Sequence, residues 1–453
     1  MKKLLNFIVV ITTLLMLSAC ANNPPMQLPS NDTNAIETIV AGTLSAIPSA
    51  IPTSVPTIIS TPELTATFTP EPATLRVVYS RAGEIYIWNE GGNLVKLSNT
   101  GIDIQPRISS DGKLVVFARN NELYAVNPDG SNLRVIVSKE YLNLYRPEGY
   151  KWIWAEHYDW MLNTHILYFT TITQKENDGF PSYQFDLHRI DVDTGDASIV
   201  LPAGQGGVPY FSPNKQTMAV IKPDSISLAN VDGSEWRTAL PFERVFTYSE
   251  WFFIPIVTPL PDASGFRVII PAHDPLGNPG ELSELWELPL KGQPVLLHTF
   301  LQNGFSLRAL SPSGNSMAYS KKDASGNSSL CSYQHNVAQE TCIPKVGEQV
   351  YADAWSLNDS KYNYQTIDKV LTGSDYVYET TRYIMSATES NGLAVKIDGY
   401  VWFEWVNPEQ YLYIDEEWNL RLATLGDSSF LIHNGVKAPA SKDGILPFDF
   451  STR

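Results

Sequence analysis

The chain has 453 residues, of which 43% are hydrophobic, 11% aromatic and 18% charged. This composition supplies a large core and excludes disorder throughout the chain. The formal net charge of −16 argues against a nucleic-acid partner, because such binding depends on Lys and Arg neutralising phosphates. Short runs of aromatic and β-branched residues, broken by Gly, Pro, Asn and Asp, predict strands and argue against an all-helical protein.

The first twenty residues have the features of an export signal. Lys2 and Lys3 precede an apolar run over 4–17, which suits a signal peptide and is short for a membrane span. The run ends in Leu17-Ser18-Ala19-Cys20, which resembles the lipobox of bacterial lipoproteins. The resemblance implies a signal peptide over 1–19, lipidation of Cys20, and an extracytoplasmic protein anchored to the bacterial membrane, at the cell surface or in the periplasm. The alternative is an ordinary signal peptide with a chance cysteine.

Residues 20–74 are expected to form a tether behind the lipidated cysteine. From Ala21 to Thr74 the chain holds nine Pro and ten Thr but no Lys or Arg. Such a segment cannot bury enough apolar surface to offset the entropy lost on ordering. We therefore expect a disordered Pro/Thr-rich linker that holds the folded domain away from the membrane.

The pattern changes at Leu75, where short strands separated by turns begin. Strands are predicted over 76–80, 84–88 and 94–98, and they form a meander. The segment from Gln105 to Ala118 then places a Ser-Asp-Gly turn before a strand that is apolar on both faces. Such a strand is expected where a sheet is covered on both sides.

This segment resembles the repeat of TolB-type, WD40-like β-propellers, in which an apolar residue and Ser-Pro-Asp-Gly precede a buried strand. Further copies begin at Phe211, Leu310, Trp355 and Trp405, and two divergent units cover 154–171 and 251–270. A spacing of about fifty residues is typical of a propeller or repeat array. The resemblance implies an all-β fold, with one propeller domain over 75–453. Eight blades are favoured if 445–450 completes the first blade, and seven remain the alternative if 356–397 is a loop.

The two remaining cysteines, Cys331 and Cys342, are expected to form a disulfide. Each lies in a predicted short strand, with His335 to Gln339 as the turn between them. An oxidising compartment favours pairing. A structural zinc site is the alternative, but it needs four ligands and His335 is the only other soft ligand nearby.

Sequence motifs point to no particular chemistry. The chain lacks a Gly-x-Ser-x-Gly elbow and a phosphate-binding Gly-rich loop, and its histidines form no metal-spaced pair. We therefore assign no catalytic residue, metal site or cofactor. Asp191 to Asp196 superficially suggests a calcium loop, but its ligand positions do not fit, and a turn between outer strands is favoured.

The densest group of aromatic and acidic residues provides the candidate ligand-binding site. Its rings could stack on sugar or peptide, while its carboxylates orient the ligand. The alternative is that Trp152 and Trp154 pack between blades. A second candidate is Trp402-Phe403-Glu404-Trp405, for which core packing is favoured. The residues of the first group are Trp152, Trp154, Glu156, His157, Tyr158, Asp159 and Trp160.

Two classes of function fit these features. The first is a monomeric, non-catalytic lipoprotein whose propeller binds or scaffolds a protein, peptide or envelope glycan. The second is a propeller-fold enzyme acting on glycans, a hydrolase or lyase, with carboxylates at the channel mouth. Two carboxyl groups within about 5–10 Å of each other would favour the enzyme, because glycoside hydrolysis uses that separation.

Overall fold

The computed structural model describes residues 74–452 apart from 250–251, 276, 279, 303–307, 323–324, 373–374, 388–393 and 438–446. The expected signal peptide, Cys20 and all of the tether except Thr74 therefore lie outside the described residues. Within the described part of the chain, no helix has both the length and the apolar character needed to cross a membrane.

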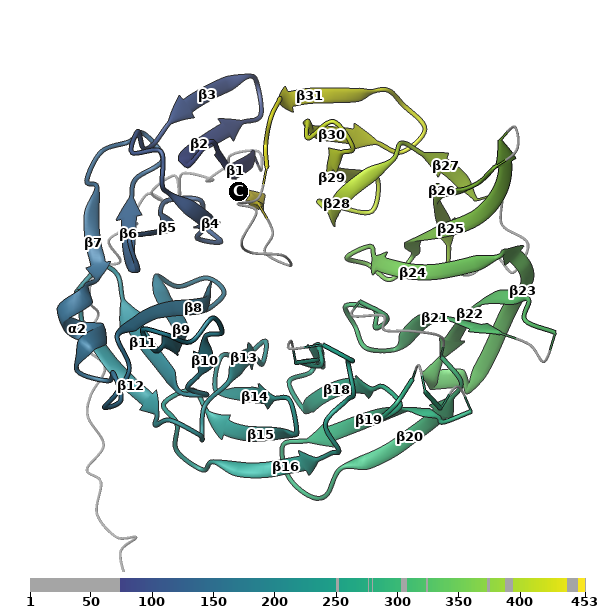
Figure 1. Cartoon of the computed structure of the whole chain (residues 1–453), viewed down its shortest axis with the longest axis horizontal. Coiled ribbons are helices and arrows are strands. Elements are labelled where there is room, and N and C mark those ends of the chain that lie inside the picture. Colours follow the sequence, from purple (N-terminus) through teal and green to yellow (C-terminus); the bar gives the residue numbers. More distant parts are fainter. Residues whose placement is uncertain are drawn as a thin grey trace, which may run out of the picture. The chain divides into compact units, whose positions relative to one another are not determined.

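The described residues form eight antiparallel sheets arranged as blades around a ring (Figure 1). The predicted all-β propeller with eight blades is thus confirmed. Blade 1 contains β32 (Phe448–Thr452), β1 (Leu75–Arg81), β2 (Glu84–Asn89) and β3 (Asn93–Lys96). Blade 2 contains β4 (Ile104–Ile108), β5 (Val115–Arg119), β6 (Glu122–Val126) and β7 (Arg134–Val137). Blade 3 contains β8 (Trp152–Trp160), β9 (Ile166–Gln174), β10 (Ser182–Tyr183), β11 (Leu187–Asp191) and β12 (Ala197–Leu201).

The remaining blades follow in chain order around the ring. Blade 4 contains β13 (Val208–Phe211), β14 (Thr217–Lys222), β15 (Ser225–Asn230) and β16 (Arg237–Pro241). Blade 5 contains β17 (Val257–Pro259), β18 (Gly265–Ile270), β19 (Ser283–Pro289) and β20 (Val295–Phe300). Blade 6 contains β21 (Ser316–Lys322), β22 (Ser328–Gln334) and β23 (Gln339–Gly347). Blade 7 contains β24 (Gln349–Trp355), β25 (Lys361–Thr372), β26 (Asp375–Ser386) and β27 (Val395–Ile397), and blade 8 contains β28 (Tyr400–Trp405), β29 (Gln410–Asp415), β30 (Leu420–Thr424) and β31 (Ser429–His433).

The C-terminal strand closes the ring. β32 pairs with β1 in blade 1, where Phe450 lies opposite Val77. The strand expected at 445–450 therefore completes the first blade, with observed bounds two to three residues later. The stretch 356–397 contains β25, β26 and β27, so the seven-blade alternative does not hold.

Apolar contacts between neighbouring blades form the core. The described residues contain eight clusters of buried hydrophobic side chains, and each cluster joins two adjacent blades. One example is the packing of Val116 and Leu123 of blade 2 against Phe169 of blade 3. Central strands such as β18 are buried on both faces, which explains their continuous apolar sequence.

The serine of the repeat motif has a structural role. In blade 2, Ser109 is fully buried and its Oγ accepts a hydrogen bond from the backbone N–H of Leu114, across the turn. Gly112 has a φ of +70° in this turn, and a Cβ there would lie 3.2 Å from the Arg76 side chain. Three other repeats have the same serine-to-backbone bond, made by Ser212, Ser311 and Ser356.

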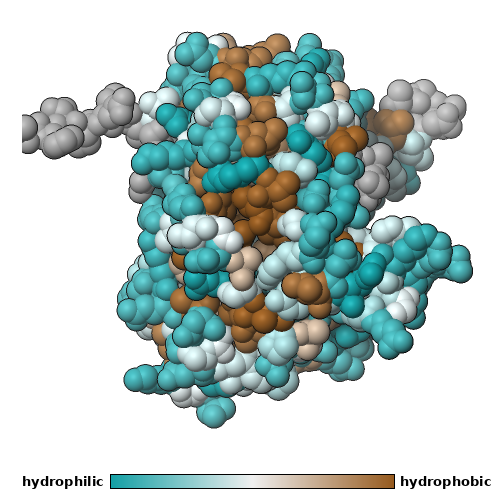
Figure 2. Space-filling view, turned by 90° about the vertical axis from the view of Figure 1, so that its left-hand side faces the viewer, coloured by the Kyte–Doolittle hydropathy of each residue, from teal (hydrophilic) through white to brown (hydrophobic). Residues whose placement is uncertain are grey.

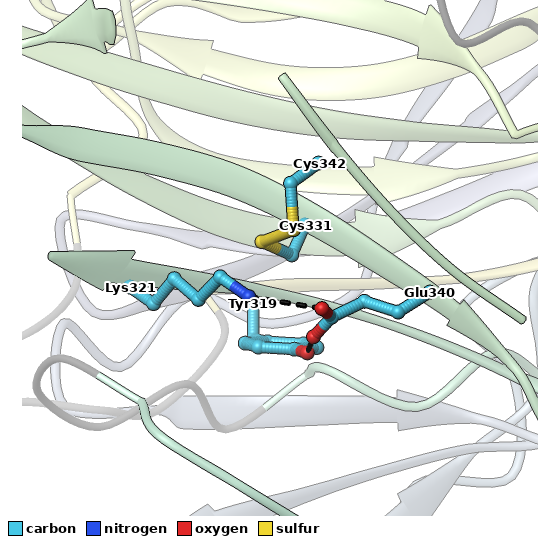
Figure 3. Close-up of a disulfide and its surroundings, with 5 residues drawn as sticks. All are labelled: Tyr319, Lys321, Cys331, Glu340 and Cys342. Carbon is cyan, nitrogen blue, oxygen red and sulfur yellow. Dashed lines mark hydrogen bonds and ion pairs between the residues drawn. A yellow bond between two sulfur atoms is a disulfide. The ribbon is translucent and has the colours of Figure 1, made fainter. Parts of the chain in front are cut away.

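The predicted disulfide is present in blade 6 (Figure 3). Cys331 of β22 lies directly opposite Cys342 of β23, and their Cα atoms are 4.1 Å apart. A short 3₁₀ turn, η1 (His335–Val337), joins the two strands. Beside the disulfide, Glu340 accepts a hydrogen bond from Tyr319 and pairs with Lys321 at 2.9 Å, which ties β23 to β21.

The outer rim of blades 2 and 3 exposes some apolar side chains. Figure 2 shows apolar surface gathered along the middle of this rim, bordered by hydrophilic residues. Exposed side chains here include Val135 of β7, Ile199 of β12 and Leu144, which follows α2 (Lys139–Asn143). This rim follows the outermost strands, so these residues lie far from the strands that surround the axis of the ring.

Candidate functional site

All seven predicted ligand-binding residues lie on β8, the innermost strand of blade 3. A bulge between Glu156 and Asp159 interrupts the pairing of β8 with β9. His157 lies in this bulge with a φ of +42°, in the left-handed region. A bulge shifts the alternation of side chains by one residue. The seven side chains therefore separate into groups that face different parts of the propeller.

Trp152 and Trp154 line a cavity of about 360 Å³ between blades 2 and 3. Trp152 is 38% exposed, and Trp154 is half-buried with its indole N–H donating to Glu156 at 3.0 Å. Blade 2 contributes the turn between β5 and β6, with Asn120 and Asn121, to the opposite wall. The two indoles therefore border open space as well as the inter-blade core. We call this cavity the tryptophan pocket.

Tyr158 and Trp160 belong to the core. Both are buried, and they pack with apolar residues of blades 2 and 3. The Tyr158 hydroxyl donates to the backbone carbonyl of Gln105, 2.5 Å away. These side chains have no surface for a ligand, so we remove them from the candidate set; the shift at the bulge turns them inward.

His157 lies outside the tryptophan pocket. Its ring is exposed and stacks on Tyr183 of β10, with ring centroids 5.9 Å apart. The two rings border a small space of about 10 Å³, which also contacts Ile254. That space is too small for a ligand, so His157 contributes to local packing.

Asp159 faces the axial channel, where it meets charged residues of the neighbouring innermost strands. Arg107 of β4 and Asp449 of β32 interact electrostatically with it. Asp159 is exposed to the channel. Desolvation by the neighbouring protein still raises the pKa of its carboxyl, against the opposing effect of Arg107. Burial raises the pKa of Asp449 to about 6; Arg107 opposes this rise and Asp159 adds to it. Asp449 also accepts a hydrogen bond of 2.9 Å from the backbone N–H of Ile108.

A second charged group lies across the channel, around Arg308. One guanidinium nitrogen is 2.5 Å from Glu404 and another is 3.8 Å from Asp353. The two carboxyl groups therefore lie less than about 10 Å apart, which is no farther than the carboxyl groups of glycosidases. Burial raises the pKa of Glu404, and Arg308 partly offsets this effect. Two carboxyl groups thus lie near each other, and one guanidinium pairs with both.

Sequence reasoning identified only part of this channel. The sequence pattern indicated Asp159 and Glu404 but not Arg107, Arg308, Asp353 or Asp449. Of these, Arg107, Arg308 and Asp353 stand one or two positions before the apolar residue that opens a repeat motif, as Arg107 precedes Ile108. Comparing the repeats position by position would have selected them, because equivalent positions of the innermost strands surround the same axis.

Comparisons with known proteins find distant structural similarity and no family. No protein-family model matches the chain, and no curated protein matches it. Among solved structures, oligogalacturonate lyase from Vibrio parahaemolyticus is 14% identical with a TM-score of 0.42, covering 62% of this chain and 80% of that one. TolB from Acinetobacter baumannii is 11% identical with a TM-score of 0.33, covering 72% and 64%. Dipeptidyl peptidase 4 from Porphyromonas gingivalis is 12% identical with a TM-score of 0.46, covering 74% and 54%.

Proposed function

We propose that this protein is an extracytoplasmic lipoprotein whose propeller binds a protein, peptide or envelope glycan without transforming it. The carrying observation is the tryptophan pocket, an open cavity bordered by two indoles and by polar side chains. Ligand sites of proteins are typically concave, largely apolar and equipped with a few polar groups. At about 360 Å³ the pocket is near the lower end of the roughly 300–1,000 Å³ typical of such sites. It therefore suits a small ligand or one segment of a chain.

Membrane anchoring rests on the lipobox-like sequence that ends at Cys20. Two or more acyl chains hold a protein stably on a bilayer, whereas a single chain binds reversibly. Replacing Cys20→Ser should therefore leave the protein uncleaved or release it from the membrane fraction. The measurement is detergent-phase partitioning of cell fractions. Unchanged partitioning of the variant would overturn the proposed anchor.

Binding through the pocket can be tested with envelope extract. We expect the affinity-tagged full chain to capture an envelope component from the extract. The double variant Trp152→Ala/Trp154→Ala should not capture it. Tyr378→Ala is the matched control, because Tyr378 is a 63% exposed aromatic residue on blade 7. If the double variant and the wild type capture the same components, the tryptophan pocket is not the binding site.

The glycan-active enzyme remains the second candidate because of Glu404 and Asp353. A glycosidase needs one carboxyl group with a raised pKa to protonate the leaving group and a second, ionised one nearby. Burial gives Glu404 such a raised pKa. This candidate predicts release of new sugar ends from envelope glycan, and loss of that release in Glu404→Gln. Intact glycan after incubation with the wild-type protein would exclude it for that substrate.

A further inference from the structure

We infer that the tryptophan pocket selects uncharged saccharide chains over anionic saccharides and anionic peptides. This inference rests on the proposed binding function and specifies its ligand class. It depends on three features of the pocket: its aromatic faces, the pairing of its charges and its free amide groups. The net charge of the whole chain adds a fourth.

The indoles provide stacking surface. Trp152 and Trp154 both border the cavity, and their ring faces carry partial negative charge. The C–H groups on the flat face of a pyranose ring carry the complementary partial positive charge. Lys151 lies 4.8 Å from the centre of the Trp152 ring and is held by an ion pair with Glu176. Lys151 therefore covers part of that indole.

The ionic groups of the pocket are already paired with protein. Arg119 makes two hydrogen bonds to the buried carboxylate of Asp103, at 2.6 and 2.8 Å. Glu122 accepts hydrogen bonds from the backbone N–H of Lys139 and, at 3.4 Å, from the Tyr124 hydroxyl. An anionic ligand would therefore have to compete with Asp103 for Arg119. Arg119 is thus neutralised by Asp103, and the Glu122 carboxylate, whose hydrogen-bond donors are neutral, would repel an anionic ligand.

Two amide side chains remain available for hydroxyl groups. Asn120 and Asn121 form the two-residue turn between β5 and β6, with φ values of 51° and 69°. Asn tolerates this left-handed conformation, so both residues can occupy the turn at the edge of the pocket. Both are exposed at the pocket, and neither amide has a hydrogen-bond partner among the described residues. An amide both donates and accepts, so it suits a sugar hydroxyl, which does the same.

Long-range electrostatics favour the same ligand class. The chain has a formal charge of −16, and like charges repel an approaching polyanion at moderate ionic strength. Uronate-rich or phosphate-rich envelope polymers would be repelled by this field, whereas a neutral polysaccharide would not. The aromatic surface, paired charges and overall field therefore agree on an uncharged saccharide.

The test measures binding of defined oligosaccharides to the full chain by isothermal titration calorimetry. The neutral probes are the tetramers of glucose and of N-acetylglucosamine. The anionic probe is the tetramer of galacturonate, and a tetrapeptide of Asp and Gly is the anionic peptide. We expect the wild-type protein to bind at least one neutral probe. Trp154→Ala should bind the same probe about tenfold more weakly. The anionic and peptide probes should bind at least tenfold more weakly than the neutral one. Trp154→Phe, which keeps a ring, should retain part of the affinity, and Tyr378→Ala should retain all of it.

Asp103→Asn provides a test that does not depend on losing a ring. It should remove the charge that neutralises Arg119 and raise affinity for the galacturonate tetramer, with circular dichroism confirming the fold. Stronger binding of the anionic or peptide probe by wild type would overturn the inference. So would unchanged neutral binding in Trp154→Ala. The proposed binding function would survive either result if the double variant of Trp152 and Trp154 still fails to capture the envelope component. If the double variant captures it as the wild type does, the proposed function itself is overturned.

Discussion

The Asp449 carboxyl is expected to destabilise the folded propeller at neutral pH, and Asp449→Asn should relieve this effect. Burial raises its pKa from 3.8 to about 6, and each pKa unit corresponds to about 1.4 kcal/mol. The upper limit is therefore about 3 kcal/mol. The side chain is partly exposed, so solvent screening lowers this limit and we expect about 1–3 kcal/mol. The Asn side-chain oxygen can still accept the hydrogen bond that Ile108 donates at 2.9 Å.

The sign of the pH dependence follows from the raised pKa. Below pH 3.8 both the folded and the unfolded states hold the proton, and the carboxyl has no ionisation penalty. As the pH rises to about 6, the unfolded state ionises first, so the free energy of unfolding falls. The substitution should therefore have little effect at pH 4 and its full effect at pH 8. For a domain of this size, that corresponds to a rise of roughly 1–4 °C in melting temperature.

Thermal unfolding followed by circular dichroism at pH 4, 6 and 8 measures this difference. Asp129→Asn is the matched control, because it removes the same formal charge from an exposed turn of blade 2. Hydrogen bonds from Ser131 lower the pKa of Asp129, so its replacement should not stabilise the protein at pH 8. Equal effects of Asp449→Asn at pH 4 and pH 8 would refute a role for the Asp449 ionisation.

Two further predictions concern other blades. Reduction of Cys331–Cys342 should speed hydrogen exchange in the surrounding hairpin, while the other blades keep their protection. The loop-closure model limits the loss of stability to about 3 kcal/mol, because the two cysteines are eleven positions apart. Two free thiols in the air-oxidised protein would contradict the pairing. Burial alone would lower the pKa of His165, but hydrogen bonds to Asp193 and Asp111 raise it. The imidazolium bridge should therefore stabilise the fold fully below about pH 6.5 and lose this effect as pH rises through the higher folded pKa. Thermal melts should show that His165→Gln destabilises more at pH 5.5 than at pH 8.5, and equal losses would contradict the bridge.

The repeat motif made the fold predictable because it encodes a local structure that recurs in several blades. Ser109 accepts a hydrogen bond from the backbone N–H of Leu114, and Gly112 adopts a positive φ in the same turn. Both requirements restrict the sequence within a few residues, so the pattern is visible along the chain. The closing strand was also predictable, because the first meander supplied only three strands and 445–450 offered a fourth.

The channel was less predictable because it is assembled from residues far apart in the sequence. Arg107 and Asp449 are neighbours across blades 1 and 2, yet each stands alone in its own sequence segment. Burial within the ring raises the pKa of Asp449, and Arg107 opposes this rise. Neither effect can be read from the local sequence. A search for dense runs of aromatic and acidic residues cannot detect such a site, since each blade contributes one or two side chains.

The segment from Trp152 to Trp160 shows the opposite limitation. Its density suggested one site, but an innermost strand sends successive side chains to different faces, and the bulge at His157 then changes the register. Trp154 consequently borders the pocket with blade 2, Asp159 faces the axis and Trp160 enters the core. A positive φ at a histidine is not encoded by any local sequence pattern, so this division required the structure. In a propeller, residues that share a repeat position are therefore better candidates for a common site than residues that are adjacent in one strand.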